Sequence, residues 1–397
     1  MNCNTNLLVN LVMLDPKSIW SDYRFDEIPF ADIVRVGQRT LLYRDLFAVS
    51  WLLGRFCNYH CSYCWPYARS DKRDHRPTEL VLNTLAEIKR QARERSFNSF
   101  HFSFSGGEPT MHPGYLEILK TYSADQENCN YQSVHMTSNL SPGLKWFEQY
   151  AEATRPLSRV SVTASYHKEF ADKDKFLAKL ILLQQNDIQV TVNAVMVPER
   201  FELLWADAMF FHEAGINVTL KPQSNTSATR VVDGYTAEQR ERLQNGMPQR
   251  DYTRSRLAQM GRASTRPKHK LGVQDESLMN PGEEVAPALY QVELKDAAGK
   301  NWYMDQAERF NAFGFNRFKG WECSSGFRSI IIREPDGAIK RSYSCNDKPL
   351  GNIETGFKLF EGPRLCQTDS CVSSADSKIP KRRSGATHPL WPEVERE

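Results

Sequence analysis

Three cysteines in one short loop carry the clearest chemical signal in this sequence. Cys57, Cys61 and Cys64 stand in the segment GRFCNYHCSYCW, after an apolar run and before a polar, proline-broken stretch. Three thiolates spaced this closely can hold three corners of an iron–sulfur cluster, and the pattern leaves the fourth corner to another ligand. A zinc site is the alternative, but it needs a fourth ligand, and His60 lies awkwardly between the cysteines.

A second set of cysteines follows near the end of the chain. Cys323 and Cys345 flank the segment SIIIREPDGAIKRSY, whose Asp-Gly pair predicts a β-hairpin turn. Pairing of the two strands would bring both cysteines toward the same end of the hairpin. Cys366 and Cys371 return after a loop, and four thiolates in one small module suit either Zn²⁺ or an iron–sulfur cluster.

Composition narrows the class of protein. The chain has 397 residues, enough for two or three domains, and its 51 Lys and Arg nearly balance 48 Asp and Glu, so no nucleic-acid partner is required. Seven of the nine cysteines fall in two clusters, which favours metal binding over a secreted disulfide framework, and we expect Cys3 and Cys129 to be structural thiols. We find no apolar run of about 18 residues and no signal-peptide pattern, so we expect a cytoplasmic protein without membrane association.

Strand-like and helix-like segments alternate between residues 48 and 222. Apolar side chains on one face, such as Val81, Leu85 and Ile88, mark a helix between the first two strands. The alternating segments predict a parallel α/β sheet with helical crossovers. The six expected strands lie at 48–53, 100–105, 133–137, 160–165, 190–194 and 216–221.

The composition of these strands predicts the shape of the sheet. A parallel sheet covered on both faces should consist of nearly continuous apolar strands. Here apolar residues alternate with Ser, Thr, His and Asn. We therefore expect a curved sheet with helices outside and a polar, ligand-filled concave side. An antiparallel sheet with one solvated face is the alternative, which the intervening helices disfavour.

Several polar side chains should point into the concave side. Lys221, at the end of the last strand, could hold a carboxylate or a phosphate. His167 follows the fourth strand and is a candidate base or hydrogen-bond donor toward a substrate, or a surface histidine. His101 and His135 also point inward, but lower, and we expect them to be hydrogen-bonded core groups.

The cysteine spacing and a second motif resemble the radical S-adenosylmethionine superfamily. The first is Cx₃Cx₂C after the first strand, and the second is SGGEP at the end of the next strand, in Ser105 to Pro109. The resemblance covers about residues 48–222 and implies a partial (β/α)₆ barrel. It also implies that Cys57, Cys61 and Cys64 ligate a [4Fe–4S] cluster, whose fourth iron is chelated by the amino and carboxylate groups of S-adenosylmethionine.

The same resemblance implies which residues contact the cofactor. Gly106, Gly107 and Glu108 match the segment that approaches the methionine amino group, and glycines let the backbone come close to a ligand. The other implied contacts are Tyr63 near the adenine, Ser138 and Asn139 after Thr137 at the ribose, Ser165 at the end of the fourth strand, and, more weakly, Asn193 on the fifth.

The C-terminal segment resembles the SPASM and twitch extensions of this superfamily. The match rests on Cys323-Ser-Ser-Gly, the Asp-Gly hairpin, Cys345, Gly351-Asn352-Ile353 and Cys366-x₄-Cys371. Four cysteines imply one auxiliary [4Fe–4S] cluster, as in the twitch form, which would transfer electrons rather than bind substrate. The last spacing is wider than the usual Cx₂C pair, and zinc stays open.

These patterns predict five regions. We expect an N-terminal extension at 1–47, the barrel at 48–222, an irregular basic segment at 223–320, the auxiliary-cluster module at 321–380 and a flexible tail at 381–397. The segment 290–304 could form a hairpin. The basic stretch from Arg250 to Lys270 is either a solvated segment or a contact for an anionic substrate or nucleic acid.

The resemblance implies an oxidoreductase or isomerase. Reductive cleavage of S-adenosylmethionine would yield a 5′-deoxyadenosyl radical, which abstracts hydrogen from a substrate carbon, with an electron donor such as flavodoxin or ferredoxin. A peptide or small molecule would be oxidised, cross-linked or isomerised, although 47 residues before the barrel are few for a peptide-leader recognition domain. A nucleotide or modified base in nucleic acid is the alternative substrate, and a zinc-stapled, non-catalytic binding protein is the alternative class.

Overall fold

The computed structural model describes ten ranges of the chain, which are 28–37, 45–65, 69–73, 75–225, 231–248, 292–304, 315–371, 373–377, 379–383 and 385. Cys3, the basic stretch Arg250–Lys270 and most of the expected tail lie outside these ranges, so the predictions made for them stay predictions. Within the described ranges, no helix has both the length and the apolar character that a membrane span requires.

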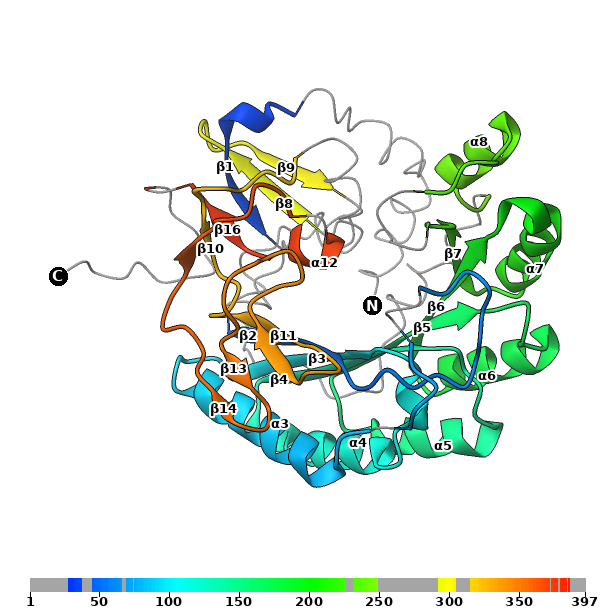
Figure 1. Cartoon of the computed structure of the whole chain (residues 1–397), viewed down its shortest axis with the longest axis horizontal. Helices are drawn as coiled ribbons and strands as arrows, with labels where there is room; N and C mark the ends of the chain where they lie inside the picture. Colours follow the sequence, from blue (N-terminus) through cyan, green and yellow to red (C-terminus); the bar gives the residue numbers. More distant parts are fainter. Residues whose placement is uncertain are drawn as a thin grey trace, which may run out of the picture.

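A ten-stranded sheet forms the centre of the molecule (Figure 1). Six of its strands lie side by side in chain order, and every neighbouring pair among them is parallel. The predicted parallel sheet is therefore confirmed, and the antiparallel alternative is wrong. The six strands are β2 (Leu46–Leu52), β3 (Ser99–Ser105), β4 (Tyr131–Ser138), β5 (Arg159–Tyr166), β6 (Gln189–Met196) and β7 (Asn217–Pro222).

Helices cover the convex face of this sheet (Figure 1). Buried and half-buried residues alternate along the strands, as in β5 and β6, because apolar side chains pack under the helices and polar ones face the concave side. The predicted curved sheet with a polar inner face is confirmed. The covering helices are α3 (Thr78–Arg93), α4 (Tyr115–Ala124), α5 (Leu144–Ala153), α6 (Lys173–Gln185) and α7 (Phe201–Glu213).

Polar side chains on the concave face bond across neighbouring strands. His101 Nδ1 lies 2.8 Å from Ser133 Oγ, which is its register partner on β4. His135 lies 2.9 Å from Ser103 Oγ through Nδ1 and 2.9 Å from Thr163 Oγ1 through Nε2. Both histidines are therefore hydrogen-bonded, as expected.

The predicted C-terminal hairpin joins the same sheet. Its strands are β11 (Ser329–Ile332) and β12 (Ala338–Lys340), and β11 pairs in parallel with β2 at the edge of the barrel. The antiparallel strands β13 (Gly351–Asn352) and β14 (Gly356–Phe357) complete the sheet beyond β12. The hairpin is thus continuous with the barrel sheet.

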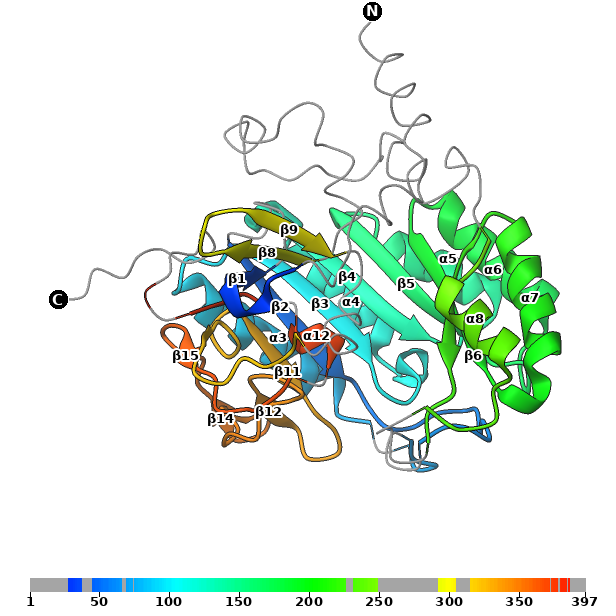
Figure 2. The same ribbon diagram turned by 90° about the horizontal axis from the view of Figure 1, so that it is seen from above.

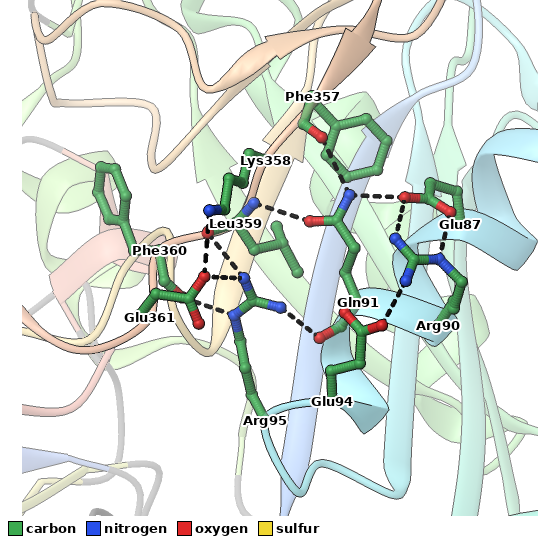
Figure 3. Close-up of polar contacts among 10 residues, drawn as sticks. All are labelled: Glu87, Arg90, Gln91, Glu94, Arg95, Phe357, Lys358, Leu359, Phe360 and Glu361. Atoms are coloured by element: carbon green, nitrogen blue, oxygen red, sulfur yellow. Dashed lines mark hydrogen bonds and ion pairs between the residues drawn. The ribbon is translucent and has the colours of Figure 1, made fainter.

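Hydrogen bonds and an ion pair connect the chain after β14 to the C-terminal end of α3, as Figure 3 shows. Gln91 donates to the carbonyl of Phe357 at 3.0 Å and accepts from the amide of Leu359 at 2.9 Å. Arg95 donates to the carbonyls of Leu359 and Phe360 and pairs with Glu361 at 2.9 Å. The barrel therefore holds the segment that leads to Cys366.

A smaller sheet contains Cys323 in one of its strands, and Cys366 directly follows another. Figure 2 shows its strands on the side of the molecule away from α7. The predicted hairpin within 290–304 is confirmed here from Val292 onward. The strand order is β15 (Arg364–Leu365), β10 (Glu322–Cys323), β16 (Lys381–Arg382), β1 (Ile33–Gly37), β8 (Val292–Asp296) and β9 (Asn301–Met304).

Strand β16 lies inside the segment expected to be a flexible tail. It pairs with both β1 and β10, so Lys381 and Arg382 belong to the sheet. Lys381 is buried, and its Nζ donates to the carbonyls of Asp376 and Ile379. The remaining helical elements are η2 (Phe30–Asp32), η4 (Pro109–Met111), η5 (Gln126–Asn128), η6 (Pro198–Arg200), α8 (Ala237–Asn245) and α12 (Ser374–Ser377).

Candidate cofactor site

The cysteine loop follows β2, and the segment directly after β3 bonds to it through the backbone. The ladder between these strands continues past their ends, because the amides of Gly107 and Glu108 donate to the carbonyls of Gly54 and Phe56 at 2.8 Å. A Cβ on Gly107 would stand 2.2 Å from the Phe56 carbonyl oxygen, a distance that only glycine avoids. The glycines are thus required for close backbone packing against the cysteine loop, and their approach to a cofactor stays a prediction.

The three thiols of this loop are free and only partly covered. Cys57 and Cys61 are half-buried, Cys64 is exposed, and none forms a disulfide. Burial and the nearby Cys57 and Cys64 thiolates raise the pKa of Cys61 to about 12. A bound iron cluster would reverse that effect, because its positive metal ions stabilise thiolates. The donor set therefore fits a cluster with an accessible position, and we infer the same three ligands as from the sequence.

A buried carboxylate connects the ends of β3 and β4. Glu108 is only 3% exposed, and burial raises its pKa. It accepts hydrogen bonds from Thr110, from the Ser138 hydroxyl at 2.7 Å and from the Asn139 amide at 2.6 Å. Asn139 in turn donates to Asn58 at 3.0 Å, within the cysteine loop. Glu108 thus acts through Asn139 on the position of the loop.

Ser138 and Thr137 differ in orientation. Ser138 is 2% exposed, and its hydroxyl donates to Glu108 and accepts from the Leu140 amide. Thr137, in contrast, lines the concave cavity. The structure therefore turns the side chain predicted to contact the ribose away from the cavity. The alternation of Ser133, His135 and Thr137 on the inner face could have indicated this, because Ser138 falls on the opposite face.

The other flank of the cysteine loop contacts the chain after β5. Tyr63 Oη lies 2.8 Å from His167 Nδ1, and their rings stack with centroids 5.8 Å apart. Ser62 donates its amide to Glu169 at 2.9 Å, a contact that no sequence motif indicated. Burial lowers the pKa of His167 to about 4, so the imidazole is neutral at pH 7. His167 thus supports the loop through Tyr63.

A cavity of about 760 Å³ runs along the concave face. Thr137, Asn193 and Lys221 line it near the carboxyl ends of their strands, and Arg159 lines it near the opposite end. Ser165 lies on the same strand face as Thr163 and pairs in register with Asn193. Among the described lining residues, four side chains are cationic (Arg159, Lys221, Arg328 and Arg341) and one is a carboxylate, Asp376.

The second cysteine set is buried. Cys323, Cys345, Cys366 and Cys371 are each at most 5% exposed, and none is in a disulfide. Cys366 and Cys371 interact through their thiols, and this interaction lowers the pKa of Cys366 and raises that of Cys371. Cys323 interacts electrostatically with Cys345 and with Cys371, so each thiol of this set has another of the set near it.

The described residues contain no group of three His, Cys, Asp or Glu side chains placed to share a single metal ion. A [4Fe–4S] cluster makes a different demand, because each thiolate binds its own iron. One buried polar atom beside the second set also lacks a partner among the described residues, which is Arg341 Nη2. The Arg341 guanidinium interacts electrostatically with Cys323 and Cys345, so a negatively charged cluster would be compatible with these surroundings.

Comparison with known proteins agrees with the cysteine loop and the parallel sheet. Residues 51–202 match the family model of the radical SAM superfamily, a range that holds Cys57, Cys61, Cys64 and the GGEP segment. Residues 51–202 therefore match a radical SAM domain, and that family implies a [4Fe–4S] cluster with S-adenosylmethionine and radical chemistry. No curated protein matches the chain.

Solved structures with a related arrangement include native anSMEcpe with bound AdoMet. It is 14% identical, with a TM-score of 0.44, over 79% of each chain. Native anSMEcpe with bound AdoMet and Cp18Cys peptide is 12% identical, with a TM-score of 0.44, over 79% of this chain and 78% of that one. Likeness at this level identifies neither a substrate nor a reaction.

Proposed function

We propose that this chain is a radical S-adenosylmethionine enzyme that removes a hydrogen atom from a polar, anion-bearing substrate in the concave cavity. The observation that carries the proposal is the lining of that cavity and its place below the cysteine loop. Thr137 lines the cavity, and Asn139, two residues later, contacts the loop at Asn58. The substrate carbon would therefore lie close to the cofactor.

The charge of the cavity supports an anionic substrate. Four cationic side chains and one carboxylate line the cavity; Arg341 is paired with Asp347 outside this lining, and Asp376 accepts hydrogen bonds from the amides of Tyr343 and Ser344. In a sheltered cavity an excess of cations favours a ligand with a carboxylate or phosphate. A volume of about 760 Å³ is typical of sites for small molecules, and a peptide side chain would also fit. A nucleic-acid substrate depends on the stretch Arg250–Lys270, outside the described residues.

The chain's own residues would position the cofactor. When bound to Cys57, Cys61 and Cys64, the cluster and S-adenosylmethionine would supply reductive cleavage of the sulfonium and a 5′-deoxyadenosyl radical. The backbone amides of Gly107 and Glu108 bond to one side of the loop, and the Tyr63–His167 contact supports the other. Ser165 and Asn193, at the upper end of the inner face, are the remaining candidates for cofactor contacts.

The second cysteine set would serve electron transfer. We assign an auxiliary [4Fe–4S] cluster to Cys323, Cys345, Cys366 and Cys371, whose complete burial suits a site that binds no substrate. A cluster with four protein ligands would accept an electron from the substrate, and the net reaction would be an oxidation. An external donor such as a flavodoxin or ferredoxin would reduce the first cluster. Zinc at these four thiols is the alternative, and analysis of the iron and zinc content of the protein distinguishes the two metals.

Anaerobic reconstitution with dithionite and S-adenosylmethionine tests the enzyme class. We expect about eight irons per chain and production of 5′-deoxyadenosine, since two four-iron clusters are proposed. A colourless protein that binds only zinc and cleaves no S-adenosylmethionine would contradict the proposal.

Deuterium transfer into 5′-deoxyadenosine tests the substrate class. Deuterated carboxylates and phosphates, each paired with its neutral amide or alcohol, are compared. We expect transfer from anionic members only, and a KM at least tenfold higher in Lys221→Gln. Lys145→Gln is the matched control, because Lys145 is exposed on α5. Equal transfer from the neutral partners would contradict an anion-binding cavity while leaving the enzyme class intact.

A further inference from the structure

Arg341 occupies the boundary between the concave cavity and the second cysteine set. It directly follows β12 and is 4% exposed, yet it lines the cavity. On its other side it interacts electrostatically with Cys323 and Cys345. A buried guanidinium is costly unless charged partners compensate it, so its position between two sites calls for an explanation.

The contacts of Arg341 point toward the cysteines. Its Nε donates to Ser325 Oγ at 2.9 Å, and that hydroxyl lies 3.3 Å from Cys323 Sγ. Its Nη1 donates to Asp347 at 2.8 Å, which is the only carboxylate paired with it among the described residues. Its Nη2 is buried and has no hydrogen-bond partner within the same residues. Buried donors are nearly always paired in native proteins.

An anionic iron–sulfur cluster on the four thiols would give the Arg341 guanidinium a negatively charged neighbour, because Arg341 already interacts electrostatically with Cys323 and Cys345. Reduction adds one negative charge to a cluster, and a fixed cation with N–H donors nearby stabilises the reduced form more than the oxidised one. Hydrogen bonds and charges around the ligands are known determinants of the potential of such centres.

We propose that Arg341 is a positioning residue that raises the reduction potential of the auxiliary cluster. The guanidinium acts directly through its charge and through Ser325 on Cys323. Asp347 moderates this effect, because its carboxylate compensates part of the charge of Arg341. This inference rests on the auxiliary cluster of the proposed function.

Potentiometric titration followed by EPR spectroscopy tests the role of Arg341. The parent is the full chain with Cys57, Cys61 and Cys64 replaced by alanine, so that only the auxiliary cluster is observed. In this background Arg341→Gln is expected to lower the equilibrium constant for reduction at least tenfold, which is 59 mV for a one-electron couple. Arg341→Lys keeps the charge and should show a smaller decrease.

Two further variants give results that a purely structural role would not produce. Asp347→Asn should shift the potential upward, opposite to Arg341→Gln. Ser325→Ala should shift it downward by less, and this milder change serves if Arg341→Gln fails to fold. Arg333→Gln is the matched control, because Arg333 is exposed on the same hairpin, and it should leave the potential unchanged.

The outcomes separate this inference from the proposed function. A parent protein without iron at the four thiols overturns both the auxiliary cluster and the role of Arg341. A loaded cluster whose potential is the same in Arg341→Gln, Asp347→Asn and Ser325→Ala overturns the role of Arg341 alone. Cleavage of S-adenosylmethionine by the unmodified chain is measured separately and tests the enzyme class.

Discussion

The two cysteine sets of this chain have opposite surroundings. Cys57, Cys61 and Cys64 lie within eight residues, on a partly exposed loop held from both flanks by polar and backbone contacts. The second set is spread from Cys323 to Cys371, and all four of its thiols are buried. A loop with three donors that are half-buried or exposed leaves room for an exogenous ligand, whereas a buried group of four suits electron transfer. Burial of the thiols, more than their number, therefore distinguishes the two proposed roles.

Removal of each set should have different consequences, and this is the largest expected effect. Replacing Cys57, Cys61 and Cys64 by alanine should abolish S-adenosylmethionine cleavage while leaving about half of the iron. Replacing Cys323 and Cys345 by alanine should also remove about half of the iron, yet cleavage without product formation should persist. Iron analysis and assay of 5′-deoxyadenosine check this, and loss of cleavage in both variants would contradict separate roles.

Gly107→Ala should disturb the first set and spare the second. The added methyl group would stand 2.2 Å from the Phe56 carbonyl oxygen, so the loop must shift. Overpacking of this kind costs about 1–3 kcal/mol, and we expect S-adenosylmethionine cleavage to fall at least tenfold. Gly143→Ala is the control, because a methyl group there meets nothing within 4 Å. Unchanged cleavage in Gly107→Ala would show that the loop is not held in this way.

Glu108→Gln should weaken the same loop by a smaller amount. The carboxylate accepts hydrogen bonds from Thr110, Ser138 and Asn139, and an amide NH₂ in its place would face one of these donors. A buried donor left unpaired costs about 1–3 kcal/mol. Chemical denaturation of the metal-free chain measures the loss, with Glu117→Gln on the exposed face of α4 as control. Equal stability of the two variants would contradict a structural role for Glu108.

His167 gives the smallest expected effect, and it depends on pH. Burial lowers the pKa of His167 to about 4 in the folded chain, against about 6.5 in an unfolded one. The unfolded chain therefore binds the proton first as the pH falls, so stability is lost between about pH 6.5 and pH 4. His167→Gln should show a shallower loss across this window in urea denaturation. An identical slope in both chains would contradict a neutral, buried imidazole.

The inner face of the barrel could be predicted from sequence because its signal is local. Alternation along 160–165 and 190–194 reflects the two faces of each strand directly, and the Cx₃Cx₂C loop is contiguous. The helix signal is clearer in α3, which has 16 residues, than in α4, which has 10 residues between β3 and β4.

The remaining features depend on contacts between distant residues. The pairing of β11 with β2 joins Ser329 to Ala48, and no local pattern specifies it. Glu108 belongs to the GGEP motif, but its bonds to Ser138 and Asn139 cross thirty residues and follow from the adjacency of β3 and β4. The charged residues of β16 do not indicate a strand in the sequence. Lys381 is buried because its ammonium group donates to backbone carbonyls of the preceding segment.

EPR spectroscopy of the reduced protein with and without S-adenosylmethionine tests the separation of the two sites most directly. The chain with Cys323 and Cys345 replaced by alanine should show a cluster signal that changes when S-adenosylmethionine is added, because the open iron of the first set binds it. The chain without Cys57, Cys61 and Cys64 should show a signal that does not change. A signal that responds in the second chain, or fails to respond in the first, would contradict the assignment of the open cluster to the Cys57–Cys64 loop.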